Sequence, residues 1–326
     1  MYLCVVKFRI NSNIDTMKRI VCVALLGLLG LQLAMADAYI SPSSYDYKPQ
    51  AKKITANART DMQKLRAIYD WMCENIQYDT SYKIATADEC YKKRKGVCQA
   101  YSELMYRLCE AVGVKCTIVS GTARHFLGGG GHAWICAHVE GRNVLIDPTW
   151  GAGFVNGTKF TFRDDHSYWF DVDPYWMIFT HFPKNEAYQF LARPISYERF
   201  EKLPRLDPNC KYFGWDAKDI FLKCINGTIT SWPELYNQEE QYLQLTEIPF
   251  QEELKVGRTY RFKVKAQNPR NIAIINNSTW YTYELWRYDG QYSIIDITPR
   301  EKGKLSISYE RKDGMYDTIV EYKVVR

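Results

Sequence analysis

Three short fragments of the sequence contain residue types that could together carry out nucleophilic chemistry. They are Gly96-Val97-Cys98-Gln99-Ala100-Tyr101, Gly131-His132-Ala133-Trp134 and Leu145-Ile146-Asp147-Pro148-Thr149-Trp150. Cys98 falls at the first turn of an expected amphipathic helix, where unpaired backbone N–H groups and the helix dipole favour an anion. A thiol in that position is shifted towards thiolate, which is the nucleophilic form. A lone cysteine is more simply interpreted as a small core residue, so the neighbours of Cys98 matter.

His132 and Asp147 lie on consecutive predicted strands, and the link between the strands contains the plausible two-residue turn Glu140-Gly141. If Val139 pairs with Arg142, His132 and Asp147 occupy one face of the sheet, one diagonal step of roughly 7–8 Å apart. A three-residue loop would place them on opposite faces. The two-residue turn also gathers an apolar set on the other face: Ala133, Ile135, Val144 and Ile146. A carboxylate bonded to one imidazole nitrogen leaves the other nitrogen free to take a proton from Cys98.

The remaining histidines have simpler interpretations. His125 and His138 could compete with His132, but His138 lies beside the turn and is expected on the surface. His166 and His181 have no matched partner and are expected to be ordinary polar residues. We therefore assign His132 to the candidate site.

Four residues are candidates for lining a substrate cleft: Gln99, Gly131, Trp134 and Trp150. The glycine run at 128–131 lacks the Gly-Lys-Ser/Thr ending of a phosphate-binding loop, so nucleotide binding is not indicated. We predict instead that this run forms a mobile edge of the cleft, which would let a substrate approach His132. Trp134 and Trp150 either wall the cleft or pack in the core, and the sequence favours neither.

Hydrophobic periodicity predicts helices followed by strands in this part of the chain. Apolar residues lie on one stripe over residues 61–78, and a second helix begins near Cys98 and ends at Gly113, which is placed to cap it. Short β-rich runs follow at 115–120, 133–139 and 144–146. Helices followed by antiparallel strands predict an α+β fold.

Beyond about residue 205 the pattern changes to short strands. Residues 260–265 alternate apolar with charged side chains, and Asp289-Gly290 and Asp313-Gly314 sit between β-rich runs as hairpin turns. We therefore predict an all-β, immunoglobulin-like sandwich domain over residues 206–326, after a first domain over residues 37–205. Packing is the simpler role for its aromatic residues, and contact with a protein or glycan through an exposed aromatic face is the alternative.

The N-terminus has the pattern of a secretory signal peptide. Lys18-Arg19 precede an apolar run from Ile20 to Leu33, and Ala34-Met35-Ala36 supply the small residues of a cleavage site after Ala36. The apolar run is shorter than the ~20 residues needed to span a membrane, so cleavage is favoured over an uncleaved anchor. The sequence thus predicts that residues 1–36 are removed and that the protein is secreted, periplasmic or on the cell surface. No integral membrane segment is predicted after cleavage.

Composition and charge exclude several classes of protein. The chain has 326 residues, of which 46% are hydrophobic and 25% charged, as in folded globular proteins. The formal net charge is +6, but residues 1–36 supply +3, so the remainder carries only +3 (6 − 3), which does not indicate nucleic-acid binding. The cysteines form no CxxC pair and no zinc-type spacing with histidine, so neither a metal nor a cofactor is predicted.

Taken together, the three fragments resemble the transglutaminase-like superfamily, whose papain-like core uses a Cys–His–Asp triad in that chain order. The stretch from Tyr69 to Asp79 is similar to the helix ahead of the nucleophile in that family. Later fragments resemble its kyphoscoliosis peptidase branch: Trp169-Phe170, Asp173-Pro174, Thr180-His181-Phe182-Pro183, Tyr188-Gln189-Phe190-Leu191 and Phe200-Glu201-Lys202-Leu203-Pro204. The resemblance covers roughly residues 60–205. It implies Cys98 as nucleophile, His132 as general base and acid, and Asp147 as the carboxylate that orients His132.

The leading hypothesis is an exported cysteine hydrolase, a peptidase or amidase, that cleaves a peptide or protein substrate through a thioester on Cys98. The backbone N–H of Cys98 is a natural oxyanion donor, and the sequence does not assign a second donor. One alternative is a protein cross-linking acyltransferase, in which a lysine amine intercepts the same thioester. The other is a non-catalytic scaffold at the cell surface that binds through the β domain.

Overall fold

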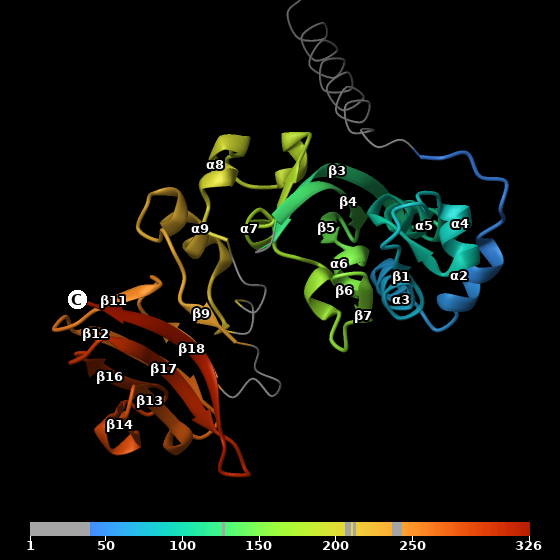
Figure 1. Cartoon of the computed structure of the whole chain (residues 1–326). Coiled ribbons are helices and arrows are strands. Elements are labelled where there is room, and N and C mark those ends of the chain that lie inside the picture. Colours follow the sequence, from blue (N-terminus) through green and yellow to red (C-terminus); the bar gives the residue numbers. More distant parts are fainter. Residues whose placement is uncertain (1–39, 126–127, 206–209, 211–212, 237–242) are drawn as a thin grey trace, which may run out of the picture.

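The computed structural model describes residues 40–125, 128–205, 210, 213–236 and 243–326. The predicted signal peptide, residues 1–36, lies outside these ranges. Helices and strands are mixed in the first part of the described chain, and strands dominate after residue 234, as Figure 1 shows. This arrangement confirms the predicted α+β core followed by a strand-rich region.

Four helices form the N-terminal part of the core, and three of them pack against the fourth, α5, which carries Cys98 (Figure 1). Helix α3 (Asp61–Asn75) begins at a capping box: the Thr60 side chain accepts from the backbone N–H of Gln63, and the Gln63 side chain accepts from the backbone N–H of Thr60. Its helical stretch ends at Asn75 rather than at residue 78, because the next residues form a two-residue strand. The helices are α2 (Lys48–Ile54), α3 (Asp61–Asn75), α4 (Ala87–Lys93) and α5 (Cys98–Ala111).

Helix α5 is the central helix of this core. Tyr101, Leu104, Met105 and Leu108 are fully buried on the stripe that the sequence pattern predicts. Helix α5 ends at Ala111, and Gly113, with a φ of +78°, terminates it as expected. The Val114 N–H closes the last turn by donating to the Cys109 carbonyl.

A four-stranded antiparallel sheet packs against α5 and carries the other fragments of the candidate site. The strand order is β5-β4-β3-β8. The turn after β4 has two residues, Glu140 and Gly141, with φ values of +52° and +78°. Val139 pairs with Arg142, which confirms the predicted register. The strands are β3 (Lys115–His125), β4 (Gly128–Val139), β5 (Arg142–Ile146) and β8 (His181–Pro183).

The glycine run at 128–131, which is predicted to be a mobile edge of the cleft, lies in a paired strand. These residues belong to β4 and pair with residues 122–125 of β3. A Cβ atom on Gly129 would lie 2.7 Å from the carbonyl oxygen of Ala123, so the close approach of β3 requires glycine there. Glycine allows the two strands to approach closely here. A run of glycines has the same local sequence pattern whether it lies in such a strand or in a loop.

Short elements precede the sheet, connect β5 to β8 and follow β8. They include a small parallel pair, β1 (Gln77–Tyr78) with β2 (Lys95–Gly96), and a hairpin, β6 (Gly153–Asn156) with β7 (Lys159–Phe162). The remaining elements are α6 (Pro148–Ala152), η1 (Ser167–Trp169), α7 (Pro174–Met177), η2 (Glu186–Gln189), α8 (Tyr197–Lys202) and α9 (Ala217–Ile225).

The strand-rich region consists of two sheets, with strand orders β10-β12-β16-β15 and β11-β18-β17-β13-β14, and β9 pairs with β18. The rings of Phe262 on one sheet and Tyr322 on the other are in edge contact at 5.9 Å, so the two sheets face each other. The strands are β9 (Glu234–Leu235), β10 (Leu243–Glu247), β11 (Glu253–Lys255), β12 (Tyr260–Ala266), β13 (Ile272–Asn276), β14 (Thr279–Tyr281), β15 (Arg287–Tyr288), β16 (Ser293–Ile297), β17 (Gly303–Glu310) and β18 (Tyr316–Val325). Short 3-10 turns, η4 (Pro269–Asn271) and η5 (Tyr283–Leu285), connect some of them.

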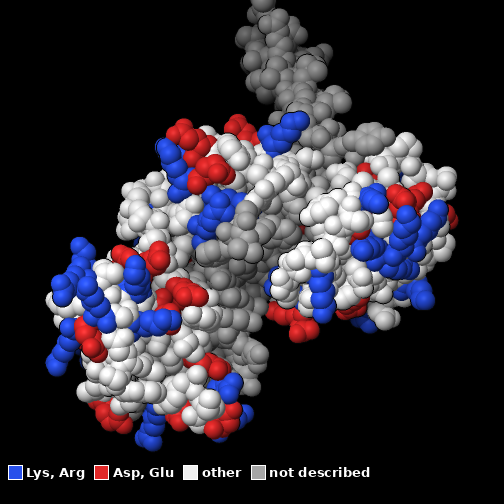
Figure 2. Space-filling view, viewed as in Figure 1, with Lys and Arg blue, Asp and Glu red and all other residues white. Residues whose placement is uncertain are grey.

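The surface carries both signs of charge. On the face shown in Figure 2, Lys and Arg side chains are interspersed with Asp and Glu side chains over both parts of the molecule. Across the described ranges, we find no helix that is both long and apolar enough to cross a membrane.

Arg124 of β3 connects the sheet to the segment that follows β8. Its side chain is 4% exposed and donates to the backbone carbonyls of Phe179, Glu201 and Leu203 at 3.2, 3.1 and 2.9 Å. The guanidinium also lies 4.2 Å from the ring centroid of Phe200. A buried arginine that satisfies three carbonyls from distant segments holds those segments to β3.

We expect Arg124→Met to lower the free energy of unfolding by about 3 kcal/mol, because three carbonyls lose their donor. Urea unfolding of the purified variant measures this loss. Arg142→Met is the matched control: Arg142 makes two bonds of 2.6 Å to Asp171, but both side chains are well exposed, so its loss is expected to cost less than about 1 kcal/mol. Equal losses in the two variants would contradict the role assigned to Arg124.

Candidate active site

Cys98 is the first residue of α5, as the sequence predicts, and its thiol faces β4. The N-cap residue, Val97, provides no side-chain cap, so the backbone N–H groups of the first turn have no capping side chain there. The His132 side chain and the backbone of Ala133 lie close enough to the sulfur to lower the pKa of Cys98. Strand β5 pairs with β4 only as far as Ile135, so it does not cover the backbone of β4 at Ala133.

These contacts favour the thiolate. Burial acts to raise the pKa of Cys98, but the hydrogen bond and charge of His132 and the hydrogen bond from Ala133 outweigh burial, so the pKa lies below its ordinary value. Burial also acts to lower the pKa of His132, but the Asp147 carboxylate and the Cys98 sulfur raise it to about 10. Both shifts favour a thiolate–imidazolium pair over a neutral thiol and imidazole.

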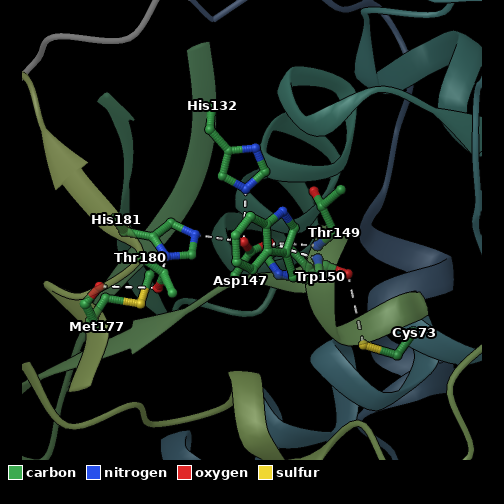
Figure 3. Close-up of polar contacts among 9 residues, drawn as sticks. Cys73, His132, Asp147, Thr149, Trp150, Met177, Thr180 and His181 are labelled. Carbon is green, nitrogen blue, oxygen red and sulfur yellow. Dashed lines mark hydrogen bonds and ion pairs between the residues drawn. The ribbon is translucent and has the colours of Figure 1, made fainter. Parts of the chain in front are cut away.

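Asp147 is fully buried and bonded to His132. The Nε2 atom of His132 donates to Oδ2 of Asp147 at 2.7 Å, which leaves the other ring nitrogen, Nδ1, for Cys98 (Figure 3). Asp147 directly follows β5 and caps α6, and its Oδ1 accepts from the backbone N–H groups of Thr149 and Trp150 at 2.8 and 3.0 Å. Burial acts to raise the pKa of Asp147, but the charges and hydrogen bonds around it hold that pKa well below its usual value.

The structure thus brings together the three residues that the sequence singles out. Cys98 comes from the start of a helix, His132 from the middle of β4, and Asp147 from the residue after β5. The predicted apolar set on the opposite face of the sheet is buried, as expected: Ala133, Ile135, Val144 and Ile146. A nucleophile, a base that hydrogen-bonds it and a carboxylate that orients the base form the arrangement used in nucleophilic acyl chemistry.

His181 was wrongly expected to be an ordinary polar residue. Its side chain is 0% exposed, and its Nε2 lies 2.9 Å from the same Asp147 oxygen that bonds His132. Its Nδ1 bonds Thr180 Oγ1 at 2.8 Å. The partner was missed because Asp147 is 34 residues away in sequence, although the fragment around His181 is among those that resemble the family. His166 also has a partner, since its Nε2 lies 3.0 Å from Asp70 Oδ1.

The two competing histidines behave differently from His132. His138 is exposed and bonds Asn143, as its position beside the turn predicts. The side chain of His125 lies outside the described part of the structure.

The two tryptophans of the predicted cleft pack around the imidazoles. Trp134 is 1% exposed, and its ring stacks against His132 at 6.2 Å and meets His181 edge-on at 5.1 Å. It is therefore a core residue and not a cleft wall. Trp150 is half-buried and lies 5.6 Å from the ring of His132 and 4.6 Å from that of His181. Of the two, only Trp150 has surface available for a substrate.

The other cleft candidates lie on either side of the site. Gly131 is exposed next to His132, and a Cβ atom added there would meet nothing within 4 Å. Gln99 is half-buried and donates to Glu103 at 3.0 Å, so its amide is engaged within α5. A side chain at Gly131 would point to the sheet face opposite His132, because successive residues of a strand point to opposite faces, so the open space there is not beside the imidazole. Gln99 stabilises the helix that carries Cys98.

Tyr78 is a further residue beside the nucleophile that sequence reasoning did not single out. It pairs with Gly96, two residues before Cys98, and its half-buried ring lies within electrostatic range of the Cys98 sulfur. Burial and the nearby Cys98 raise the pKa of its phenol, so Tyr78 carries its hydroxyl proton at neutral pH.

One group of side chains in the described structure has the geometry to hold a metal ion: His132, Asp147 and His181, whose ligand atoms lie within 4.8 Å of one another. The hydrogen bonds of 2.7 and 2.9 Å between these imidazoles and the carboxylate already satisfy the three groups. A metal would have to replace both bonds at a fully buried carboxylate, so the arrangement fits a hydrogen-bonded network better than a metal centre.

The described cysteines are all free thiols, and most differ from Cys98 in their surroundings. Burial raises the pKa of the Cys90, Cys136 and Cys224 thiols to about 12. Cys224 is useful for comparison because, like Cys98, it is only partly buried.

Comparison with known proteins agrees with this site. The family model of the transglutaminase-like superfamily matches residues 48–174, which include Cys98, His132 and Asp147. Residues 48–174 therefore form a transglutaminase-like domain. Kyphoscoliosis peptidase from Mus musculus and from Homo sapiens is 36% identical to this chain over 160 residues.

The similarity to these relatives is partial. The aligned segment covers 44% of this chain and 24% of each kyphoscoliosis peptidase, so the chain spans about a quarter of the length of the curated relatives it matches. Among solved structures, a candidate cysteine protease from Cytophaga hutchinsonii is 25% identical with a TM-score of 0.31, covering 33% of this chain and 40% of that chain.

Alkylation by iodoacetamide at pH 7 is expected to modify Cys98 at least about tenfold faster than Cys224, because His132 lowers the pKa of Cys98 whereas burial raises that of Cys224 to about 12. Peptide mass spectrometry of timed samples measures the two rates in one protein. His132→Ala should slow Cys98 by about tenfold while Cys224 is unaffected. Similar rates for the two cysteines in the unsubstituted protein would contradict the ion pair.

Asp147→Asn is expected to return the pKa of His132 from about 10 towards its ordinary value near 6.5. Because the pKa of His132 is raised in the fold, its contribution to stability is complete below about pH 6.5 and is lost as the pH rises through about 10. Because the pKa of Asp147 is lowered in the fold, its contribution to stability is present only above about pH 4. The stability advantage over the Asn variant should therefore be largest near pH 5–6 and shrink by pH 10. Urea unfolding at pH 5.5 and 10 measures it, and an advantage that grows with pH would be inconsistent with this coupling.

Proposed function

We propose that the protein is a cysteine hydrolase that cleaves an amide bond in a peptide or protein through a thioester on Cys98. One observation carries the proposal: His132 lies beside Cys98, whose pKa it lowers, and is hydrogen-bonded at 2.7 Å to the fully buried carboxylate of Asp147. The match of residues 48–174 to the transglutaminase-like superfamily supports it.

In the first half of the reaction the Cys98 thiolate attacks the carbonyl carbon of the substrate. A C–S bond forms, the C–N bond breaks, and His132 gives its Nδ1 proton to the departing amine. The products of this step are a thioester on Cys98, a free amine and a neutral imidazole. Asp147 keeps the remaining imidazole proton on Nε2, so the ring stays in the tautomer that the next step requires.

In the second half water resolves the thioester. Neutral His132 takes a proton from water through Nδ1, the oxygen attacks the thioester carbon, and the C–S bond breaks. A carboxylic acid leaves and the thiolate–imidazolium pair is restored. Both halves of the reaction require Nδ1 of His132 to point towards the reacting atoms beside Cys98. The hydrogen bond from Nε2 to the buried Asp147 carboxylate holds the ring in that orientation.

The negative charge on the carbonyl oxygen needs donors during both halves. The backbone N–H of Cys98 is available for this purpose, because the first residues of a helix have no intrahelical acceptor for their N–H groups. Tyr78 is a candidate for the second donor, because its phenol retains its proton and lies near the sulfur.

Acyl transfer to an amine is the second candidate function. The family model that matches the chain is that of the transglutaminase-like superfamily, which favours a reaction in which an amine replaces water. Acylation of Cys98 is the same in both cases, and only the group that attacks the thioester differs.

Two further proposals rest on sequence patterns alone. The pattern of residues 1–36 supports export, and the strand-rich region supports a binding role towards a protein or glycan at a cell surface. Neither is required for chemistry at Cys98.

Incubation with a glutamine-containing peptide and a primary amine distinguishes the two reactions. Hydrolysis of the peptide backbone gives two shorter peptides, whereas acyl transfer at the glutamine gives ammonia and a peptide–amine conjugate. Mass spectrometry distinguishes these products. Cys98→Ala should lower either rate by about a thousandfold or more, because no thioester can form. Cys224→Ala is the matched control and should retain full activity.

A covalent adduct on Cys98 during turnover would support both candidate reactions, and intact-protein mass spectrometry detects it. Turnover that survives Cys98→Ala would overturn both. Absence of turnover with every peptide, together with slow alkylation of Cys98, would favour the scaffold alternative.

A further inference from the structure

A second imidazole shares the carboxylate that orients His132. His181 Nε2 lies 2.9 Å from Asp147 Oδ2, and His132 Nε2 lies 2.7 Å from the same oxygen, approaching it from a different direction (Figure 3). We propose that His181 is a positioning residue, which holds Asp147 Oδ2 in place for His132 and thereby tunes the basicity of His132. This inference rests on the proposed function and adds to it a fourth residue that acts through Asp147.

The need for a second donor follows from the hydrogen bonds of the carboxylate. Oδ1 is fixed by the backbone N–H groups of Thr149 and Trp150 at the start of α6. Without His181, the only donor that the structure places on Oδ2 would be His132, which must itself move between charged and neutral forms during the reaction. A donor that does not change its charge keeps Oδ2 in one place through both forms.

His181 is held for this purpose and has no access to a substrate. Its side chain is 0% exposed, and it is surrounded by the rings of Trp134, Trp150 and Trp169 at 5.1, 4.6 and 5.3 Å. Strand β8 pairs with β3 at Ala123 and fixes the backbone of His181. A side chain so enclosed can influence the reaction only through the groups it contacts.

The charge state of His181 fits a fixed donor. Two charged or titratable groups face it, Asp147 and His132, and the groups that face His132 are Asp147 and Cys98. Burial lowers the pKa of His181 to about 4, and the charge of His132 acts in the same direction. At neutral pH its single ring proton is on Nε2, where it bonds Asp147. Nδ1 then accepts from the Thr180 hydroxyl at 2.8 Å, whose one proton is shared with the Met177 carbonyl at 3.2 Å.

A donor on Oδ2 also reduces the negative charge that the carboxylate presents to His132. An imidazolium held too strongly by a carboxylate is a poor acid towards the leaving amine. The shared oxygen therefore limits the rise in basicity of His132 while keeping the ring aligned.

The experiment compares His181→Leu, which removes the donor, with His181→Gln, whose amide can place an N–H where Nε2 lies. Uniformly 15N-labelled protein gives the pKa of His132 by NMR titration without any substrate. His181→Leu should raise that pKa by about half a unit or more. It should also lower turnover by between about tenfold and a hundredfold with little change in KM. His181→Gln should return turnover to within about threefold of the unsubstituted protein and reverse most of the rise in the His132 pKa.

His138→Leu is the matched control, because His138 lies on the same strand as His132 but is exposed and should leave both readouts unchanged. Thermal unfolding shows whether each variant is folded, and the Gln variant preserves the test if the Leu variant does not fold. An unchanged His132 pKa in a folded Leu variant, or a Gln variant no better than Leu, would overturn the inference. If the protein lacks hydrolytic activity but the His132 pKa still rises in the Leu variant, the proposed function fails and the positioning role stands.

Discussion

The buried carboxylate of Asp147 is the group on which the rest of the site depends. An ionised carboxylate removed from water is strongly destabilising unless donors replace the water molecules it has lost. Here four donors do so: two backbone N–H groups of α6 on one oxygen and two imidazoles on the other. Loss of any one donor would leave the buried charge less stabilised. The donors come from the start of α6, from β4 and from β8, so all three elements must be in position for the carboxylate to stay ionised.

The fold meets this requirement with devices that act over different distances. The two-residue turn after β4 sets the register that places His132 beside Asp147. The side chain of Arg124 ties β3 to backbone carbonyls on both sides of β8, and β8 carries His181. Aromatic rings then fill the space around the imidazoles, which excludes water and strengthens the hydrogen bonds to the carboxylate.

The same arrangement explains how one thiol can be a nucleophile while its neighbours are inert. Cys98 lies at a helix start against an imidazolium, whereas Cys90 and Cys136 are buried without a cationic hydrogen-bond partner comparable to His132. The chemistry of each cysteine is thus set by its surroundings and not by exposure alone. Whether water or an amine receives the acyl group depends on which of them reaches the thioester.

Local patterns in the sequence determined the helix that starts at Cys98, the turn at Glu140-Gly141 and the face shared by His132 and Asp147. These features depend on residues close in the chain, where helical and strand periodicity and turn preferences act directly. Only the tertiary structure decided that the glycine run at 128–131 pairs as a strand, that Trp134 packs inside, and that His181 bonds Asp147. Each of these depends on a contact between distant segments, and a histidine destined for a buried carboxylate carries the same local signal as one destined for the surface.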